Sequence, residues 1–188
     1  MRRDQLDQIL AKITELFESN DHSLGTILQR EIIRNFLKIV DDDLDTLDLK
    51  IINRSFRELR YAFKVFKPYR HIRKVSIFGS ARTPEDDPYY KMAVELARLL
   101  AKRHYMVITG AASGIMKAGN EGAGADKSFG VNIHLPFEQG ANEYIEDDPK
   151  LVTFKYFFTR KMIFVMESHA IALFPGGFGT HDEGFETL

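Results

Sequence analysis

Residues 170–183 read AIALFPGGFGTHDE and hold the pattern on which the fold depends: an apolar run, a glycine-rich turn and the beginning of a polar helix. An apolar run that ends in glycine also occurs in KVSIFG at residues 74–79 and in YMVITG at residues 105–110. Such short, nearly continuous runs are typical of strands that are buried on both faces of a parallel sheet.

Helical patterns separate these runs. We expect helices over residues 89–103, 114–126 and 157–168, a further strand over residues 129–133, and a polar loop over residues 135–150. Strands that alternate with helices predict an α/β fold, namely a Rossmann-like, doubly wound parallel sheet with helices on both faces.

The first seventy residues contain one glycine and have helical patterns instead. Apolar residues recur at helical spacing from Leu6 to Phe17, from Leu28 to Ile39 and from Ile52 to Phe66. Pro68 is expected to end the last of these helices, because proline cannot continue the hydrogen-bonding pattern.

We therefore predict an N-terminal helical extension at residues 1–70 and a Rossmann-like domain at residues 71–188. The sequence stops at Leu188, about two turns into the last expected helix. Doubly wound sheets usually continue past such a point, so we expect the C-terminal end of this domain to be truncated.

Composition excludes several classes of protein. The 188 residues carry 26 Lys and Arg against 27 Asp and Glu, and this balance argues against non-specific nucleic-acid binding. A run of about 18 apolar residues, which a membrane span requires, is missing. The first residues do not resemble a secretory signal. Cysteine is absent, which excludes disulfides and thiolate chemistry and fits a cytoplasmic location.

The turn after residue 174 is a candidate phosphate site. Glycine lets backbone N–H groups approach an anion closely, and the following helix directs the positive end of its dipole to the same point. The residues concerned are Gly176, Gly177, Gly179 and Thr180. The alternative is that glycine here, as at Gly79, only permits a tight turn. Neither a dinucleotide fingerprint nor a Walker loop is present.

Charged residues flank this turn. Glu183 lies one helical turn after Thr180, although the same spacing is typical of a helix-capping box. Arg160 and Lys161 could reach a phosphate or a ribose, although such a pair is more often solvated. The neighbouring Phe157, Phe158, Met162 and Phe164 are interpreted as core residues.

We expect no bound metal. The histidines lack ligand spacing, and the run Asp41-Asp42-Asp43-Leu44-Asp45 lacks the glycine and the glutamate of a calcium loop. That run is better interpreted as a helix cap and a solvated linker.

Taken together, these segments resemble the Lonely Guy family. Residues 175–183, PGGFGTHDE, are similar to its PGGxGTxxE motif, and Thr159-Arg160-Lys161 is similar to the Arg-Lys pair that accompanies it. Residues 77–82 and residues 109–116 resemble its other nucleotide-site segments. The resemblance covers about residues 73–188. The second segment departs from the family, because Gly110 is followed by alanines where members often have glycines.

The resemblance implies a phosphoribohydrolase that cleaves the N-glycosidic bond of nucleoside 5′-monophosphates, either AMP-type nucleotides or cytokinin ribotides, to a free base and ribose 5-phosphate. It implies Arg160 and Glu183 as the catalytic pair, with no cofactor and, where the full domain is present, with a homodimer or higher homo-oligomer. The helix N-terminus would keep Glu183 ionised. The implied substrate- and phosphate-binding residues are Gly79, Ser80, Arg82, Gly110, Gly114, Met116, Lys161, Gly176, Gly177, Gly179 and Thr180.

Two other functions remain open at this point. The first is a non-catalytic module on the same fold that binds or senses nucleotides. The second is an interaction protein whose helical part docks a partner while the sheet domain is structural. Release of adenine from AMP would separate the enzyme from both, and stabilisation by AMP would separate a binder from a purely structural domain.

Overall fold

The structure is a computed structural model that describes residues 8–9, 11–13, 15, 23–135 and 140–185. Contacts divide the chain into two compact units, Met1–Ile52 and Asn53–Leu188. None of the helices in these described ranges is both long and apolar enough to cross a membrane.

The first unit contains helix α2 (Leu24–Lys38) and the beginning of α3 (Thr46–Phe66), which confirms the predicted second and third helices. Ser23 caps α2, and the Asp45 carboxylate accepts backbone N–H groups in the first turn of α3 at 2.7 and 2.9 Å. The aspartate run therefore includes a helix cap, as its sequence predicts. The helix predicted from Leu6 to Phe17 falls largely outside the described residues.

The second unit is built on a five-stranded sheet. Its strands are β1 (Lys74–Phe78), β2 (Met106–Thr109), β3 (Ser128–Ile133), β4 (Leu151–Phe154) and β5 (Ala170–Leu173), in the order β4-β3-β2-β1-β5. All neighbouring strands are parallel, which confirms the predicted fold class. Strand β4 is not predicted from the sequence.

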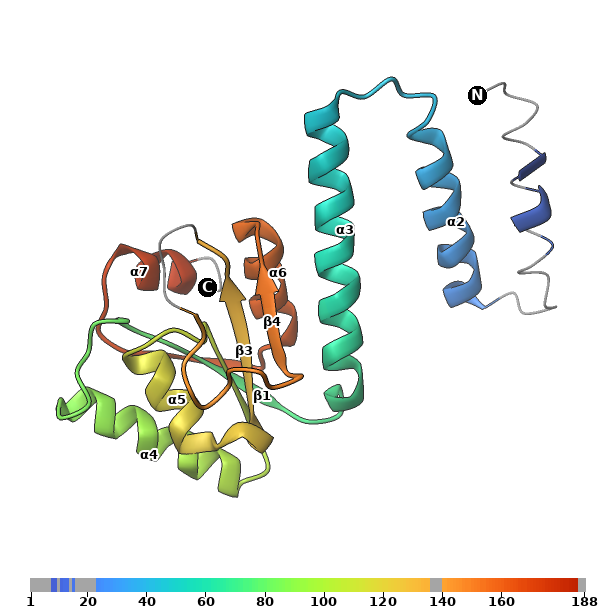
Figure 1. The fold of residues 1–188 in the computed structure, drawn as a ribbon. Helices are drawn as coiled ribbons and strands as arrows, with labels where there is room; N and C mark the ends of the chain where they lie inside the picture. The colour runs from blue at the N-terminus through green and yellow to red at the C-terminus, as the bar shows by residue number, and fades with distance from the viewer. Residues whose placement is uncertain (1–7, 10, 14, 16–22, 136–139, 186–188) are drawn as a thin grey trace. The chain divides into compact units, whose positions relative to one another are not determined.

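Helices cover both faces of this sheet (Figure 1). Helices α4 (Pro88–Lys102) and α5 (Ile115–Ala123) pack on one face, around Ile77 and Val107. Helix α6 (Phe157–Glu167) packs on the other face together with the C-terminal half of α3, which contributes Ala62 and Phe66. The ring of Phe66 stacks on that of Phe129 with centroids 4.3 Å apart.

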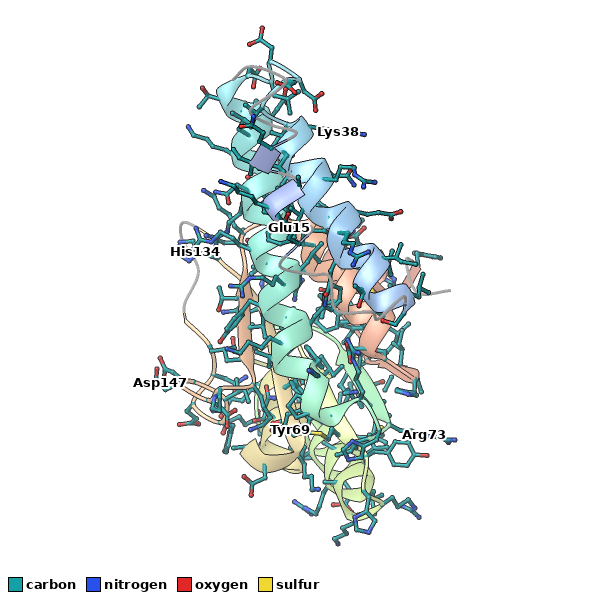
Figure 2. All side chains as sticks on the ribbon, turned by 90° about the vertical axis from the view of Figure 1, so that its right-hand side faces the viewer. Glu15, Lys38, Tyr69, Arg73, His134 and Asp147 are labelled. Atoms are coloured by element: carbon teal, nitrogen blue, oxygen red, sulfur yellow. The ribbon has the colours of Figure 1, made fainter. Side chains whose placement is uncertain are left out.

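Short helices complete the connections. They are η1 (Lys67–Tyr69), η2 (Ala125–Lys127) and α7 (Phe178–Phe185), of which α7 follows β5. In Figure 2, Arg73 marks the end of the sheet at which the parallel strands begin, next to the start of β1. His134 marks the end at which they finish, next to the end of β3.

The strand order creates a crevice at the carboxyl ends of the strands. The chain proceeds from β1 to β2 on one side, whereas β5 lies on the other side of β1. Connections that leave β1 and β5 therefore turn to opposite faces of the sheet. In open α/β sheets, ligands bind at such a switch point, outside the carboxyl ends of the strands.

Gly114 fixes one wall of this crevice. Its φ of 63° is a conformation that L side chains rarely adopt, and a Cβ atom here would collide with the carbonyl oxygen of Ser80. The adjacent amide of Ile115 donates to that same oxygen at 3.0 Å. Gly114 thus allows the loops after β1 and β2 to touch.

We expect Gly114→Ala to lower the free energy of unfolding by about 3 kcal/mol or more, because strain and a backbone collision add. Gly124 is a matched control, since its φ is 75° but a Cβ there would meet open space. Gly124→Ala should cost about 1–2 kcal/mol, the strain alone. Urea denaturation measures both values, and equal losses would contradict the proposed contact with Ser80.

Candidate functional site

The crevice is a cavity of about 510 Å³ at the carboxyl ends of the strands. This volume lies in the ordinary range of small-molecule sites. Residues from the loops after β1, β2, β3 and β5, from the end of β3 and from the first turns of α5, α6 and α7 line it. They are Gly79, Ser80, Ala81, Arg82, Gly110, Ala112, Met116, Asn132, Ile133, Leu135, Phe157, Arg160, Gly177, Phe178, Gly179, Thr180 and Glu183.

Most of the residues singled out from the sequence meet here, although they come from four separate segments of the chain. Three of them do not line the cavity, and the structure gives each another contact. Gly114 packs beneath Ser80, Gly176 lies against the Thr180 side chain, and Lys161 pairs with Asp182 at 2.8 Å. The geometry therefore does not support contact between a ligand in this cavity and Gly114, Gly176 or Lys161.

Arg160 and Glu183 form the charged centre of the crevice. Nη1 of Arg160 donates to a carboxylate oxygen of Glu183 at 2.8 Å, and Nε donates to the Val131 carbonyl at 2.9 Å. The guanidinium also lies 5.0 Å from the centroid of the Phe164 ring. Arg160 is only 6% exposed, so the interpretation of this residue as solvated is wrong.

The capping-box alternative for Glu183 does not match the local geometry. A capping box pairs the residue before the helix with the third residue of the helix. Helix α7 begins at Phe178, so Thr180 is itself the third helical residue, and its N–H donates to the Gly177 carbonyl at 3.0 Å. Glu183 lies one turn further and faces Arg160.

Burial raises the pKa of Glu183 above its ordinary value, although Arg160 favours the ionised form and opposes the shift. Asp182 contributes to the rise and Lys161 opposes it. The loss of hydration thus outweighs the favourable charges of Arg160 and Lys161. A carboxyl whose pKa is perturbed in a crevice is suited to accepting and returning a proton.

Gly110 gives Arg160 its space. A Cβ atom at this position would lie 2.7 Å from Nη2 of Arg160 and 2.6 Å from Sδ of Met116. Any side chain at residue 110 would therefore displace the guanidinium.

A buried asparagine holds the loop after β2. Residue 111, one of the alanines that replace family glycines, has a φ of 63°. Asn142 holds this conformation by donating its backbone N–H to the Ala111 carbonyl at 2.8 Å and its side-chain amide to the carbonyls of Ala111 and Ala112. Asn142 is not predicted as a site residue from the sequence, because it lies in the polar stretch expected to form a loop.

The turn before α7 presents open backbone. A Cβ atom at Gly177 or Gly179 would meet nothing within 4 Å, and neither residue has a positive φ. Neither protein packing nor backbone conformation requires glycine there. The N–H of Thr180 donates to the Gly177 carbonyl, but the N–H groups before it at the start of the helix have no intrahelical acceptor, so this turn offers donors to an anion in the crevice.

Exposed aromatic side chains stand at the same crevice. Phe157 is 50% exposed and Phe178 is 95% exposed, and both line the cavity. The interpretation of residues 157, 158 and 162 as core is therefore wrong, because all three side chains are exposed, whereas Phe164 is buried as predicted. Whether each side chain is buried depends on the face of α6 that it occupies, and the sequence pattern leaves that face ambiguous.

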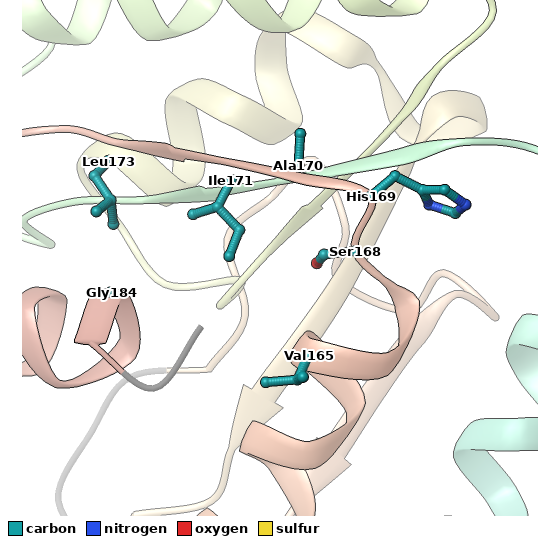
Figure 3. Close-up of a pocket in the computed structure, with 7 residues that line it drawn as sticks. All are labelled: Val165, Ser168, His169, Ala170, Ile171, Leu173 and Gly184. Atoms are coloured by element: carbon teal, nitrogen blue, oxygen red, sulfur yellow. The ribbon is translucent and has the colours of Figure 1, made fainter. Parts of the chain in front are cut away.

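A second cavity lies between β5, α6 and α7, as Figure 3 shows. It has a volume of about 360 Å³ and is bordered by Val165, Ser168, His169, Ala170, Ile171, Leu173 and Gly184. This lining includes neither charged residue of the crevice. Among the residues that the structure describes, no three His, Cys, Asp or Glu side chains gather in a way that could hold a metal ion.

Comparison with known protein families identifies the family to which the chain belongs. A model of the SLOG cluster4 family matches residues 72–187. No curated protein matches the chain significantly. Among solved structures, the chain is similar to the X-ray structure of TM1055, a structural genomics target, with a TM-score of 0.48 and 25% identity over 62% of this chain and 68% of that chain.

Two structures of the molybdenum cofactor carrier protein of Chlamydomonas reinhardtii are also similar. One has a TM-score of 0.48 and 19% identity over 62% of this chain and 70% of that chain. The other has a TM-score of 0.45 and 21% identity over 60% of this chain and 67% of that chain.

We expect Gly177→Ala to separate stability from ligand binding. The free energy of unfolding should change by less than about 1 kcal/mol, because the new methyl group meets open space. The affinity for AMP, measured by calorimetric titration, should fall at least about tenfold, because the methyl group occupies the approach to the amides. Unchanged affinity would show that a ligand anion does not use this turn.

Proposed function

The chain belongs to the SLOG cluster4 family, a family of the Lonely Guy type, and on this premise we propose that it hydrolyses the N-glycosidic bond of nucleoside 5′-monophosphates. The products are a free base and ribose 5-phosphate, and the substrates are AMP-type nucleotides or cytokinin ribotides. The observation that carries the proposal is the ion pair of buried Arg160 with partly buried Glu183 at 2.8 Å beside an open glycine turn.

Glu183 acts on the reacting bond. Cleavage of a ribosyl C–N bond passes through an oxocarbenium-like state with positive charge at the anomeric carbon. The carboxylate stabilises this charge and accepts a proton from the attacking water, whose oxygen bonds to that carbon. The base leaves with the electron pair of the broken bond and takes up the proton that Glu183 accepted from the water, which regenerates the carboxylate. The raised pKa of Glu183 favours its action as a proton acceptor.

Arg160 and the glycine turn hold the substrate. Arg160 uses Nε and Nη1 for Val131 and Glu183, and a guanidinium has five N–H donors, so others remain for a ribose or phosphate oxygen. The 5′-phosphate lies against the amides of the turn that includes Gly177 and Gly179, with the Thr180 hydroxyl as a further donor. Binding of the phosphate, which does not react, places the glycosidic bond at Glu183.

The aromatic side chains indicate where the base lies. A nucleobase stacks favourably on aromatic rings, and Phe157 and Phe178 present exposed rings along the crevice. They favour a ligand with a flat, partly apolar end over a simple sugar phosphate.

The proposal includes self-association into a homodimer or a higher oligomer. Helix α6 supports it, because Phe158, Val165 and Met166 are 56%, 47% and 58% exposed on this helix. Apolar side chains that project together from one helix are typical of protein interfaces.

The main test is incubation with AMP followed by chromatography for adenine and ribose 5-phosphate. We expect the unmodified chain to release adenine, and Glu183→Gln to lower kcat by about 100- to 10,000-fold, the range for loss of a general base. AMP should still stabilise the variant in a thermal shift assay, because Arg160 and the glycine turn remain.

Asp182→Asn is the matched control. This neighbouring acid is mostly exposed, pairs with Lys161 and does not line the crevice, so kcat should stay within about fivefold. Undiminished turnover in Glu183→Gln would refute the catalytic role of Glu183. AMP binding without any release of base by the unmodified chain would favour the nucleotide-binding or sensing module.

Substitution of Phe157 tests the position of the base. Phe157→Ala should raise the KM for AMP by about 5- to 150-fold, because a base stacked on an aromatic ring contributes about 1–3 kcal/mol. Inhibition by ribose 5-phosphate, which lacks a base, should not change. Phe158→Ala is the control, since that side chain is exposed on the same helix but does not line the crevice. Equal effects on both ligands would place the base elsewhere.

A further inference from the structure

Glu58 is a buried carboxylate that lies outside the crevice. It belongs to the C-terminal half of α3 and is only 5% exposed. One of its oxygens accepts Nε of Arg54 at 2.6 Å and the backbone N–H of Lys155 at 2.8 Å. The other accepts the hydroxyl of Thr159 at 2.6 Å. A side chain of α3 thus binds two groups in the short segment where α6 begins.

This carboxylate places a negative charge beside the start of α6. Tyr156 stands at the N-cap position of α6 and makes no side-chain capping bond. The positive end of the helix therefore receives its negative charge from Glu58. Burial raises the pKa of Glu58, but the hydrogen bonds from Thr159, Arg54 and Lys155 outweigh that effect and leave its pKa below the ordinary value. The group accordingly stays charged at neutral pH.

The anchored segment leads directly to the catalytic pair. Thr159, which donates to Glu58, is followed by Arg160, which donates to Glu183 in the crevice. Successive residues of a helix point about 100° apart, so one bond fixes the rotation of α6 on the α3 side while the next side chain projects toward the ligand. Loss of the anchor would let α6 rotate or shift, and the long Arg160 side chain would amplify that movement.

We propose that Glu58 is a positioning residue, which holds the first turn of α6 through Lys155 and Thr159 and thereby sets the guanidinium of Arg160 against Glu183. This inference rests on the proposed function, in which Arg160 binds the substrate. It also gives α3 a part in the reaction, since a helix that precedes the sheet supplies a polar contact on which the site depends.

Arginine side-chain NMR tests the positioning without any ligand. The Nε–H of Arg160 is buried and bonded to Val131, so it should give a slowly exchanging signal that Arg160→Lys identifies by its loss. We expect the signal to persist in Thr159→Ser and in Arg54→Gln, which keep the two bonds to the start of α6. It should be shifted or broadened in Thr159→Val, which has nearly the same shape but lacks the hydroxyl, and in Glu58→Ala.

Kinetics on the same variants measures the consequence. Thr159→Val and Glu58→Ala should lower kcat for AMP hydrolysis about tenfold or more, because a misplacement of about 1 Å near a reacting centre has effects up to about 100-fold. Thr159→Ser and Arg54→Gln should stay within about threefold, as expected when an exposed or equivalent bond is changed. Glu58→Gln should recover most of the activity, since its amide can accept from Lys155 and donate to Thr159.

The outcomes separate this inference from the hydrolase proposal. If the unmodified chain releases no adenine but the Arg160 signal moves as expected, the positioning holds and the hydrolase proposal fails. If the folded Glu58→Ala and Thr159→Val variants keep both the signal and kcat, the positioning role is refuted. Should Glu58→Ala not fold, Thr159→Val alone decides, because it removes one hydroxyl at nearly constant volume.

Discussion

A buried arginine needs an anion, and in this protein Glu183 supplies it at 2.8 Å. Breaking a buried ion pair by removing one partner typically costs about 3–5 kcal/mol, because the remaining charge is left without water or a counter-ion. The pair joins α6 to α7, two helices on either side of β5 in the chain. Their relative position is therefore constrained at the point where a ligand would meet both.

Several features of the surrounding structure make room for this pair or hold it. Gly110 has no side chain where the guanidinium lies, and the Val131 carbonyl accepts one of its N–H groups. Glu58 secures the start of α6 from the opposite side. These contacts come from α3, β3 and the loop after β2, so the site requires the folded sheet and not only the glycine motif.

Sequence patterns predict most of the elements of the sheet unit because each pattern is local. The apolar runs before Gly79 and Gly110 are strands, and the amphipathic stretch from residue 89 is a helix. Strand β4 is missed because LVTF spans four residues between two lysines and gives little periodic signal. Asn142 is missed because an asparagine in a polar stretch looks the same whether it is exposed or bonded to buried carbonyls.

Two pairs of adjacent charged residues show which features the sequence determines and which depend on the tertiary structure. Arg160 and Lys161 are both cations, and Asp182 and Glu183 are both anions, so the sequence determines that opposite charges stand near the glycine turn. It does not determine which of them meet in the crevice. The fold places Arg160 with Glu183 inside, and Lys161 with the mostly exposed Asp182 outside. The reason is that neighbouring residues of a helix point about 100° apart, and only the packing of α6 and α7 on the sheet decides which direction is inward.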